Sequence, residues 1–441
     1  MLSVIRALRH SGSPRGKVLF LIVALISWVL YFFSPRIFDR TPPELLVDNV
    51  STGQVLREVV TLLITATDAR AGVKYLYLQI DDGPVQTLQR LKTRTTSRKS
   101  EYIYDLSDLT DGSHQILITA VDNAFRQNEK QVWLDFVIDL TPPQVKLETK
   151  PKVGTQGNTL ALFIVTNELL KEIQATLFGK KLPLYPLSTN PDAGHKLHWY
   201  RGLVGISVGQ QAGYHSVETV ATDLAGNQSE QVFILEIEET EFEQGGYIKL
   251  SPEKQKVMLD KSKSREDNAK RAKAYAVADQ TAEQLWVAPF VRPASGTLTS
   301  PFGKYREYNT GVKRHHLGTD IANQTGTAIY AGSNGIVTLA ERLHIYGNSV
   351  IINHGQGVST SYNHLSEIKV EVGDRVEKNQ QIGLMGATGQ VTGPHLHWHM
   401  AVNGVAVAPE QWIEVNFSTL KHVLDPTEGT TTYSREDDLV E

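Results

Sequence analysis

The chain has 441 residues, a formal net charge of -4 at pH 7, and an ordinary globular composition with 41% hydrophobic and 21% charged residues. This length predicts about three domains, and because the charge leaves no basic footprint we expect no nucleic acid as a partner. The sequence has no cysteine, which excludes a thiol nucleophile, a thiolate zinc site and a disulfide framework.

The N-terminus carries the most apolar run of the chain, VLFLIVALISWVLYFF at residues 18–33. We expect a cytoplasmic N-terminus at residues 1–17 and a single-pass transmembrane anchor at 18–34, helped by flanking residues because the run is slightly short for a bilayer core. Basic residues precede the run, namely Arg6, Arg9, Arg15 and Lys17. They predict that the rest of the chain lies on the periplasmic or extracellular side of the plasma (inner) membrane.

Two alternatives to an anchor remain. A cleaved signal peptide would need a small-x-small cleavage pattern, whereas SPRIFDR follows at residues 34–40. A buried core helix is the other alternative, but nothing else in the chain is so apolar.

An internal repeat occupies the next two hundred or so residues. DRTPP at 39–43 recurs as DLTPP at 139–143, and AVDNAFRQNEKQV at 120–132 is echoed by ATDLAGNQSEQV at 221–232. Alternating apolar and polar runs flank each echo, which predicts strands joined by turns. We therefore expect two consecutive β-sandwiches, at residues 41–139 and 140–239.

These two units resemble the bacterial immunoglobulin-like repeats of surface and envelope proteins, in which a strand ending ATDxAGN and a TPP junction recur. The resemblance covers residues 41–239 and implies two immunoglobulin-like modules. Asp122 and Asp223 lie in the echoed turns. They have two interpretations: calcium ligands between modules, or side chains that cap their own turns, which is the favoured one.

A helical linker is expected at residues 240–289. From Ser251 to Trp286 the sequence is rich in Lys, Glu, Asp, Gln and Ala and has no glycine, which favours one long helix that Ser251 caps and Pro252 begins. We expect its charges to form a solvated face. Coiled-coil pairing is an alternative, although the apolar positions keep no clean heptad.

The sequence pattern of the C-terminal part predicts a compact, glycine-rich all-β domain at residues 290–418. A polar, flexible tail is expected at 419–441. Short alternating runs such as GIVTLAER and NSVIINHG are separated by glycines, and helix signals are absent. The fold class expected for the whole chain is thus mainly β: an N-terminal transmembrane helix, two sandwiches, a long connecting helix and a C-terminal all-β domain.

Histidines cluster in this last domain, because eight of the fourteen fall between residues 315 and 399. HLGTD offers His316 and Asp320, whereas HLH offers His395 and His397 on one side of a strand. A catalytic zinc site needs three protein ligands and one open position for water, and two histidines with one aspartate would satisfy it. Any one of these histidines taken alone is more simply explained as a core or surface residue.

Residues 290–413 resemble zinc metallopeptidases of the M23 family, of the lysostaphin and LytM type. Seven motifs in family order carry the resemblance: SPFG at 300–303, HLGTDIA at 316–322, GTAIYA at 326–331, YGNSVIINHG at 346–355, YNHL at 362–365, VGDRVEKNQQIGLMGATG at 372–389 and TGPHLH at 392–397.

The resemblance implies roles for five residues. His316 and Asp320 match the H-x-x-x-D motif and His397 the second histidine of H-x-H, so these three are the expected ligands of Zn²⁺. His364 and His395 correspond to the family's two catalytic histidines, which do not bind the metal. Which of the two acts as the base stays open.

His399 departs from the family pattern, in which a glutamate often follows as HLHFE. It shares a face with His397 and has two interpretations, a second-shell partner that orients a ligand or a packing residue. His315 is expected to face away from the metal. His344 and His354 lie in turn-like stretches and are expected to be exposed.

The implied function is a membrane-anchored zinc endopeptidase that cleaves peptide crosslinks of peptidoglycan through a metal-activated water. Its expected partners are peptidoglycan peptides, the membrane and a regulatory protein. One alternative is a non-catalytic M23-like activator or scaffold of other wall hydrolases; such domains typically lose metal ligands, whereas all five positions are filled here. Another is a spacer or adhesion protein whose sandwiches are its main function.

Overall fold

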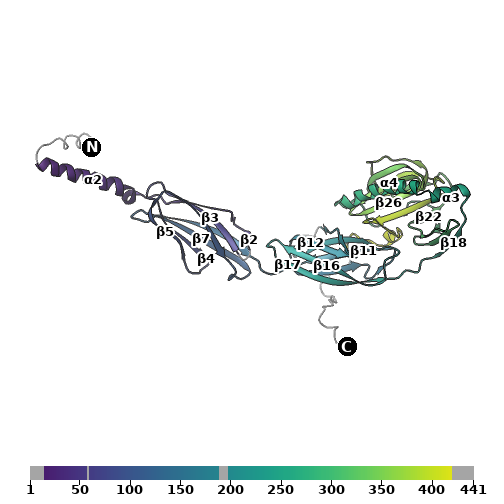
Figure 1. Cartoon of the computed structure of the whole chain (residues 1–441), viewed down its shortest axis with the longest axis horizontal. Coiled ribbons are helices and arrows are strands. Elements are labelled where there is room, and N and C mark those ends of the chain that lie inside the picture. The colour runs from purple at the N-terminus through teal and green to yellow at the C-terminus, as the bar shows by residue number, and fades with distance from the viewer. Residues whose placement is uncertain (1–13, 57–58, 188–196, 420–441) are drawn as a thin grey trace, which may run out of the picture. The chain divides into compact units, whose positions relative to one another are not determined.

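Strands are the commonest regular structure in the computed structural model, which describes residues 14–56, 59–187 and 197–419 (Figure 1). The chain divides into two compact units, Met1–Pro142 with Leu224–Asn227, and Pro143–Asp223 with Gln228–Glu441. The extreme N-terminus and the predicted tail beyond residue 419 lie outside the described residues. The mainly β fold class is confirmed, with few helices.

The helix α2 (Pro14–Phe38), the first in the described residues, contains the apolar run near the N-terminus. Within the described part of the chain, no helix combines the length and the apolar character needed to cross a membrane. The anchor at residues 18–34 stays a prediction.

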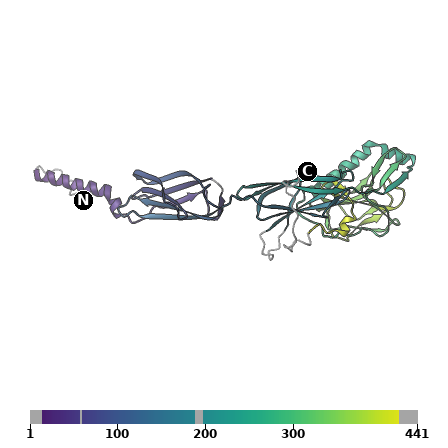
Figure 2. The ribbon, with the colours of Figure 1, turned by 90° about the horizontal axis from the view of Figure 1, so that it is seen from below.

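The first repeat is a sandwich of two sheets, shown from two sides in Figures 1 and 2. One sheet has the order β1-β3-β6, with bounds Glu44–Asp48, Val59–Thr67 and Ser97–Asp105. The other has the order β2-β8-β7-β4-β5, with bounds Gln54–Leu56, Glu129–Ile138, Gly112–Asp122, Val73–Ile80 and Gln86–Thr95. Alternate residues of both sheets, such as Ile64 and Ile118, meet in one core. Its immunoglobulin-like type stays a prediction.

The second repeat is also a two-sheet sandwich. One sheet has the order β14-β15-β11-β9, with bounds Tyr185–Leu187, His198–Gly205, Thr159–Thr166 and Val145–Lys150. The other has the order β10-β17-β16-β12-β13, with bounds Gly154–Thr155, Gln228–Glu238, Gly213–Asp223, Leu170–Leu177 and Lys180–Leu182. Every residue of β11 is buried, which means that both faces of this strand are covered.

The prediction of one long helix from Ser251 to Trp286 is wrong. The chain forms α3 (Pro252–Leu259) and α4 (Lys261–Gln280). Asp260 between them has an extended backbone, and its side chain accepts a hydrogen bond from the backbone N–H of Ser262, so it caps a new helix. The same linker also contains β18 (Gln244–Ile248).

The predicted solvated face of this helix is only partly correct. α4 packs against β24 (Gly335–Leu343) and β25 (Gly347–Gly355), and it buries Asp267 and Arg271. The Asp267 carboxylate accepts hydrogen bonds from the backbone N–H groups of His344 (2.9 Å) and Ile345 (2.7 Å). The helix therefore belongs to the C-terminal domain.

The C-terminal domain is built on a ten-stranded sheet. Its main path is β19-β22-β29-β26-β25-β24-β27. The remaining bounds on this path are Thr297–Ser300 (β19), Thr319–Ala322 (β22), His395–Val402 (β29), Val358–Ile368 (β26) and Arg375–Val376 (β27). Beside it lie β23 (Ala328–Tyr330), β28 (Gln381–Met385) and β30 (Val405–Val407). A small second sheet joins β18 to β20 (Tyr305–Tyr308) and β21 (Lys313–His315), and one short helix, α5 (Gln411–Glu414), interrupts the predicted all-β pattern.

The second sandwich and the C-terminal domain share a hydrophobic core. Phe163 and Leu203 of the sandwich pack with Trp286, Phe290 and Trp412. Buried Arg201 lies over the Trp286 ring, with its guanidinium carbon 4.9 Å from the ring centroid, and donates a hydrogen bond to the Gln284 side chain (2.9 Å). This shared core explains why both parts belong to one compact unit.

His354 contradicts its prediction as an exposed loop residue. It lies in β25 with 0% of its surface exposed. Its Nδ1 is 2.7 Å from the carbonyl oxygen of Asn334 and its Nε2 is 2.7 Å from the Thr360 hydroxyl. Burial lowers the pKa of His354 to about 4, because removal from water disfavours the charged imidazolium.

This burial predicts a loss of stability in acid. The unfolded state has the higher pKa, near 6.5, so the contribution of His354 is complete above that pH and is lost as the pH falls towards 4. At pH 5 the loss is about 2 kcal/mol of unfolding free energy. Urea unfolding of the full chain at pH 7.5 and 5 should show a smaller pH effect in His354→Gln than in the wild type. His344→Gln, a change at an exposed turn, should keep the wild-type effect; equal pH effects in all three proteins would contradict the prediction.

Candidate metal centre and active site

Three neighbouring strands position the predicted site residues. β22 pairs with β29 so that Asp320 lies opposite His397 and Ala322 lies opposite His395. β29 pairs with β26 on its other side, with Asn363 opposite His397. Because side chains alternate along a strand, His395 and His397 lie on the same face of β29, next to Asp320.

His364 reaches this face through an irregularity in β26. The register between β25 and β26 shifts there and leaves one extra residue on β26, an arrangement that re-aims side chains. His364 has a φ of 65°, in the left-handed region that few residues other than glycine adopt. Its backbone N–H donates to the carbonyl oxygen of Tyr346 at 2.9 Å, which holds this conformation.

The three predicted zinc ligands converge. Asp320 Oδ1 is 3.0 Å from His316 Nε2 and 2.9 Å from His397 Nδ1, and the two nitrogens are 3.0 Å apart. Ligands at about 2.0–2.1 Å from a tetrahedral zinc ion lie roughly 3.3 Å from one another. The nitrogen and oxygen donors and their spacing therefore suit Zn²⁺ with small adjustments.

The tautomer of His316 also fits a cation. Its Nδ1 is 3.2 Å from the carbonyl oxygen of Pro301, and because a carbonyl only accepts, Nδ1 carries the proton. Nε2 then presents a lone pair to the Asp320 carboxylate and to His397. Electron pairs that converge in this way repel one another unless a cation lies between them.

Electrostatics keep Asp320 ionised and His397 neutral. Burial alone would raise the pKa of Asp320, but the close approach of the His316 and His397 ring nitrogens to Oδ1 holds it well below its usual range. Arg306 donates to the other carboxylate oxygen, Oδ2, at 2.8 Å. Burial lowers the pKa of His397 to about 3. A carboxylate and neutral imidazoles are the ligand forms that bind zinc.

His364 and His395 lie beside these donors with their ring centroids 5.0 Å apart. Nδ1 of His364 is 2.9 Å from the carbonyl oxygen of Thr388, and Nδ1 of His395 is 2.9 Å from that of Gly393. Both rings thus donate through Nδ1, and Nε2 of His395 lies 3.7 Å from Asp320 Oδ1. Burial, aided by neighbouring His397 and His395, lowers the pKa of His364 to about 3, so its imidazole is neutral at pH 7.

His399 is not one of the three converging donors. Its Nδ1 forms a hydrogen bond with the carbonyl oxygen of Leu317, the residue after His316. Its ring centroid lies 5.7 Å from that of Tyr275 on α4 and 6.5 Å from that of His397. The structure thus gives it both a packing contact and a hydrogen bond to the backbone next to the predicted ligand His316, and its role stays a prediction.

The remaining histidines lie apart from the converging donors. His315 forms a hydrogen bond with the carbonyl oxygen of Gly303 at 2.7 Å and packs against Phe242 and Tyr305. His344 is exposed in a turn, as predicted.

Sequence reasoning missed several supporting residues. Arg306 pairs with Asp320, and the Asn363 side-chain amide donates to the carbonyl oxygen of His397 at 3.1 Å. Arg271 of α4 donates to Asn363 Oδ1 at 3.2 Å. The YNHL motif contains Asn363, so the motif could have identified this residue as part of the site. No local sequence signal marks Arg306 or Arg271.

Gly318 supports the site by leaving room for His397. A Cβ added at Gly318 would lie 2.6 Å from His397 Cε1 and 2.7 Å from the carbonyl oxygen of Trp398. Distances this short would force the His397 ring or the Trp398 backbone to move, and the backbone of β29 is held by its strand pairing. Only glycine therefore fits between the two predicted ligands His316 and Asp320.

Gly318→Ala is expected to displace the His397 ring and to weaken zinc binding by at least the roughly 10-fold that follows loss of an orienting contact. Zinc retained per chain after dialysis against a weak chelator measures the effect. Gly209→Ala is the matched control, since a Cβ there meets nothing within 4 Å. Equal zinc retention by the two variants would contradict this role of Gly318.

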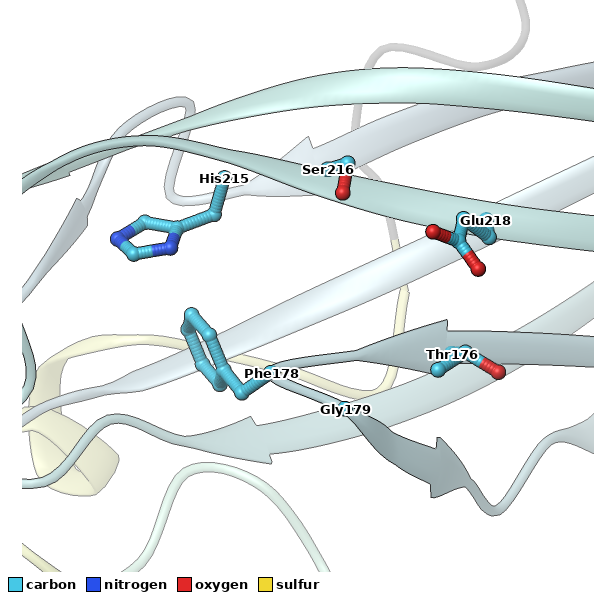
Figure 3. A pocket seen from close by; sticks show the side chains of 6 residues that line it. All are labelled: Thr176, Phe178, Gly179, His215, Ser216 and Glu218. Carbon is cyan, nitrogen blue, oxygen red and sulfur yellow. The ribbon is translucent and has the colours of Figure 1, made fainter.

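A pocket of about 190 Å³ lies elsewhere, on the second sandwich (Figure 3). The Phe178 and His215 rings meet edge to face across it, with centroids 5.0 Å apart. The lining residues are Thr176, Phe178, Gly179, His215, Ser216 and Glu218. None of them was predicted as a site residue, and we assign the pocket no role in the chemistry.

One sheet thus brings two histidines and one aspartate to a common point, with His364 and His395 alongside. Residues 314–409 match Peptidase family M23, so the C-terminal domain is an M23 peptidase-family domain.

Curated relatives resemble this domain. It is 46% identical over 89 residues to the peptidoglycan DD-endopeptidase ShyA of Vibrio cholerae, a match that covers 20% of this chain and 21% of the relative. It is 40% identical over 112 residues to the DD-carboxypeptidase/endopeptidase Mpg of Neisseria meningitidis, covering 25% of this chain and 26% of the relative. The chain thus matches only about a quarter or less of the length of these relatives.

Among solved structures, a Pseudomonas aeruginosa protein described as an M23 peptidase is 25% identical, with a TM-score of 0.40. That match covers 59% of this chain and 94% of the other. The catalytic domain of lysostaphin from Staphylococcus simulans is 31% identical, covers 27% of this chain and 93% of the other, and has a TM-score of 0.25.

Proposed function

We propose that the chain is a zinc-dependent endopeptidase that cleaves peptide crosslinks of peptidoglycan and is tethered to the membrane. The observation that carries the proposal is the convergence of His316 Nε2, Asp320 Oδ1 and His397 Nδ1 within 3.0 Å of one another. Two further histidines, whose Nδ1 atoms are bonded to backbone carbonyls, lie next to this point and could transfer protons in a hydrolytic reaction.

Zinc would be held by His316, Asp320 and His397. Two neutral imidazoles and one carboxylate leave a net charge of about +1, and when bound the ion acts as a Lewis acid and lowers the pKa of water. The donor set leaves a fourth position for water or substrate.

His364 and His395 would handle the protons. Each presents Nε2 as an acceptor, so either can take a proton from the attacking water and then carry it to the departing amine. The protonated imidazole can also donate a hydrogen bond to the oxyanion of the tetrahedral intermediate. The carbonyl groups of Thr388 and Gly393 would hold both rings in the required tautomer.

The relatives support peptidoglycan as the substrate class. ShyA is named a peptidoglycan DD-endopeptidase, and Mpg is named a DD-carboxypeptidase/endopeptidase. We propose that the same kind of wall peptide binds here. A regulatory protein would be an additional partner, since an uncontrolled wall hydrolase endangers its own cell.

The membrane tether is proposed from the apolar run at residues 18–33. Large apolar side chains of α2, including Leu21 and Leu25, are more than half exposed, and contiguous apolar surface of this kind marks an interaction site. The tether would place the protein at the plasma (inner) membrane as a single-pass protein, with the residues after the anchor on the periplasmic or extracellular side.

A non-catalytic activator is the alternative from a different class. Digestion of purified sacculi by the full chain in mild detergent, followed by mass analysis of the muropeptides, separates the two. The proposed enzyme converts crosslinked dimers to monomers without help. An activator releases nothing unless a second wall hydrolase is added, and that outcome would overturn the proposal.

A further inference from the structure

Three aspartates of the first sandwich form a buried cluster apart from the proposed active site. Asp39 precedes β1, Asp68 follows β3 and Asp122 ends β7. Their exposed fractions are 2%, 6% and 0%. One carboxylate oxygen of each lies within 4.8 Å of an oxygen of the other two. Three carboxylates at this spacing need a positive charge or protons to offset their repulsion, because burial of unpaired charge costs free energy.

Asp68 provides an independent sign of a missing ligand. Its Oδ1 accepts hydrogen bonds from the backbone N–H groups of Arg70, Ala71 and Gly72 at 2.8–3.1 Å. Its Oδ2 is buried and has no hydrogen-bond partner. A buried carboxylate oxygen left without a partner loses its hydration and gains nothing in return.

Arg70 is a basic side chain near the cluster, and its charge acts on Asp39 from beyond ion-pair distance. Within the described ranges, no lysine, arginine or histidine forms an ion pair with Asp39, Asp68 or Asp122. Asp39 and Asp122 accept only from backbone N–H groups and from uncharged side chains, those of Thr41 and Asn128. The Oδ2 atoms of Asp39 and Asp122 accept one hydrogen bond each, so each retains a second lone pair for a further partner.

The same acidic positions recur in the sequence of the second repeat. Asp39 begins DRTPP and Asp139 begins DLTPP, whereas Asp122 and Asp223 occupy the echoed turn. Asp68 directly follows β3, and Glu168 comes shortly after β11 in the second copy. Turn capping by Asp122 accounts for one position of each repeat, but it does not account for three acidic positions that recur together.

We propose that Asp39, Asp68 and Asp122 bind one Ca²⁺ ion in the first sandwich. Oxygen-only donors select a hard cation. Calcium binds oxygens at 2.3–2.6 Å, so opposite ligands lie up to about 5 Å apart, whereas magnesium at 2.0–2.1 Å needs a tighter group. The bound ion ties the segment before β1 to the loops that follow β3 and β7.

The test is calcium bound per chain, measured by equilibrium dialysis of the full chain in mild detergent. Asp68→Asn removes the negative charge but keeps an oxygen that accepts the three backbone N–H groups. We expect this variant to bind one calcium ion fewer than the wild type. Asp82→Asn, a change to an exposed aspartate of the same sandwich, should bind as many as the wild type.

Thermal unfolding provides a second readout. Calcium should raise the Tm of the first sandwich in the wild type and in Asp82→Asn, but not in Asp68→Asn; Asp39→Asn serves as the second variant if Asp68→Asn does not fold. The inference is overturned if the variants bind as many calcium ions as the wild type, if the wild type binds none at millimolar calcium, or if it prefers magnesium.

Discussion

Replacing His316 by alanine is expected to abolish zinc binding and peptide cleavage together. His316 Nε2 is one of three donors that converge within 3.0 Å, and a catalytic zinc site needs three protein ligands. The loss in activity should exceed the roughly 100-fold that follows removal of an outer hydrogen bond to a ligand. Zinc per purified chain and the rate of muropeptide cleavage are the two measurements.

The neighbouring residue offers a matched control for this variant. His315 forms a hydrogen bond with Gly303 and lies apart from the three donors. His315→Ala should therefore keep one zinc ion per chain and most of the activity. If His316→Ala kept both zinc and cleavage, the assignment of this ligand would be wrong.

Replacing His364 by asparagine is expected to leave zinc bound and to lower the rate of cleavage by about 10²–10⁴-fold, the usual contribution of a general acid or base. Asparagine tolerates the left-handed backbone found at this position, with its φ of 65°, so the fold should survive. It lacks a basic nitrogen to replace Nε2. The fall should appear in kcat, while the zinc content stays at one per chain.

Two other results at this position would contradict the assignment. Loss of zinc in His364→Asn would make His364 a ligand, and unchanged cleavage would remove it from the chemistry. His344→Asn is the matched control, because His344 is an exposed turn residue of the same domain. It should retain both zinc and activity.

The local pattern of the sequence predicted much of the site geometry. Alternation in HLHWH places His395 and His397 on one face, and the structure pairs this strand with the one that carries Asp320. The combination of HLGTD, YNHL and HLH then brought five residues together that a single motif would not connect. The roles assigned to these five residues stay predictions.

Features that depend on contacts between distant parts of the chain could not be predicted from local sequence patterns. His354 was misjudged because NHGQG has the composition of a turn, yet β25 is covered on both sides, by the domain core and by α4. Arg201 is a charged residue on a strand, and nothing local indicates that Trp286 and Gln284 will bury it. Tertiary packing sets the environment of such residues, and local patterns do not record it.

The break between α3 and α4 is a different kind of error. Asp260 is a favourable N-cap residue, so the signal was present, but the high helix propensity of the surrounding residues outweighed it. Because α4 starts at this cap, Asp267 reaches the backbone of His344 and Ile345. The cap thus sets where α4 begins and where Asp267 lies along it.

The most direct test of the proposed function is the metal dependence of peptidoglycan cleavage by the full chain. Phenanthroline prefers transition metals over calcium, since its nitrogen donors are softer than oxygen, so it removes zinc without disturbing a calcium site. We predict that the treated protein cleaves no crosslinks and that one equivalent of zinc restores cleavage. Cleavage that survives zinc removal, or zinc-loaded protein that cleaves nothing, would contradict a zinc endopeptidase.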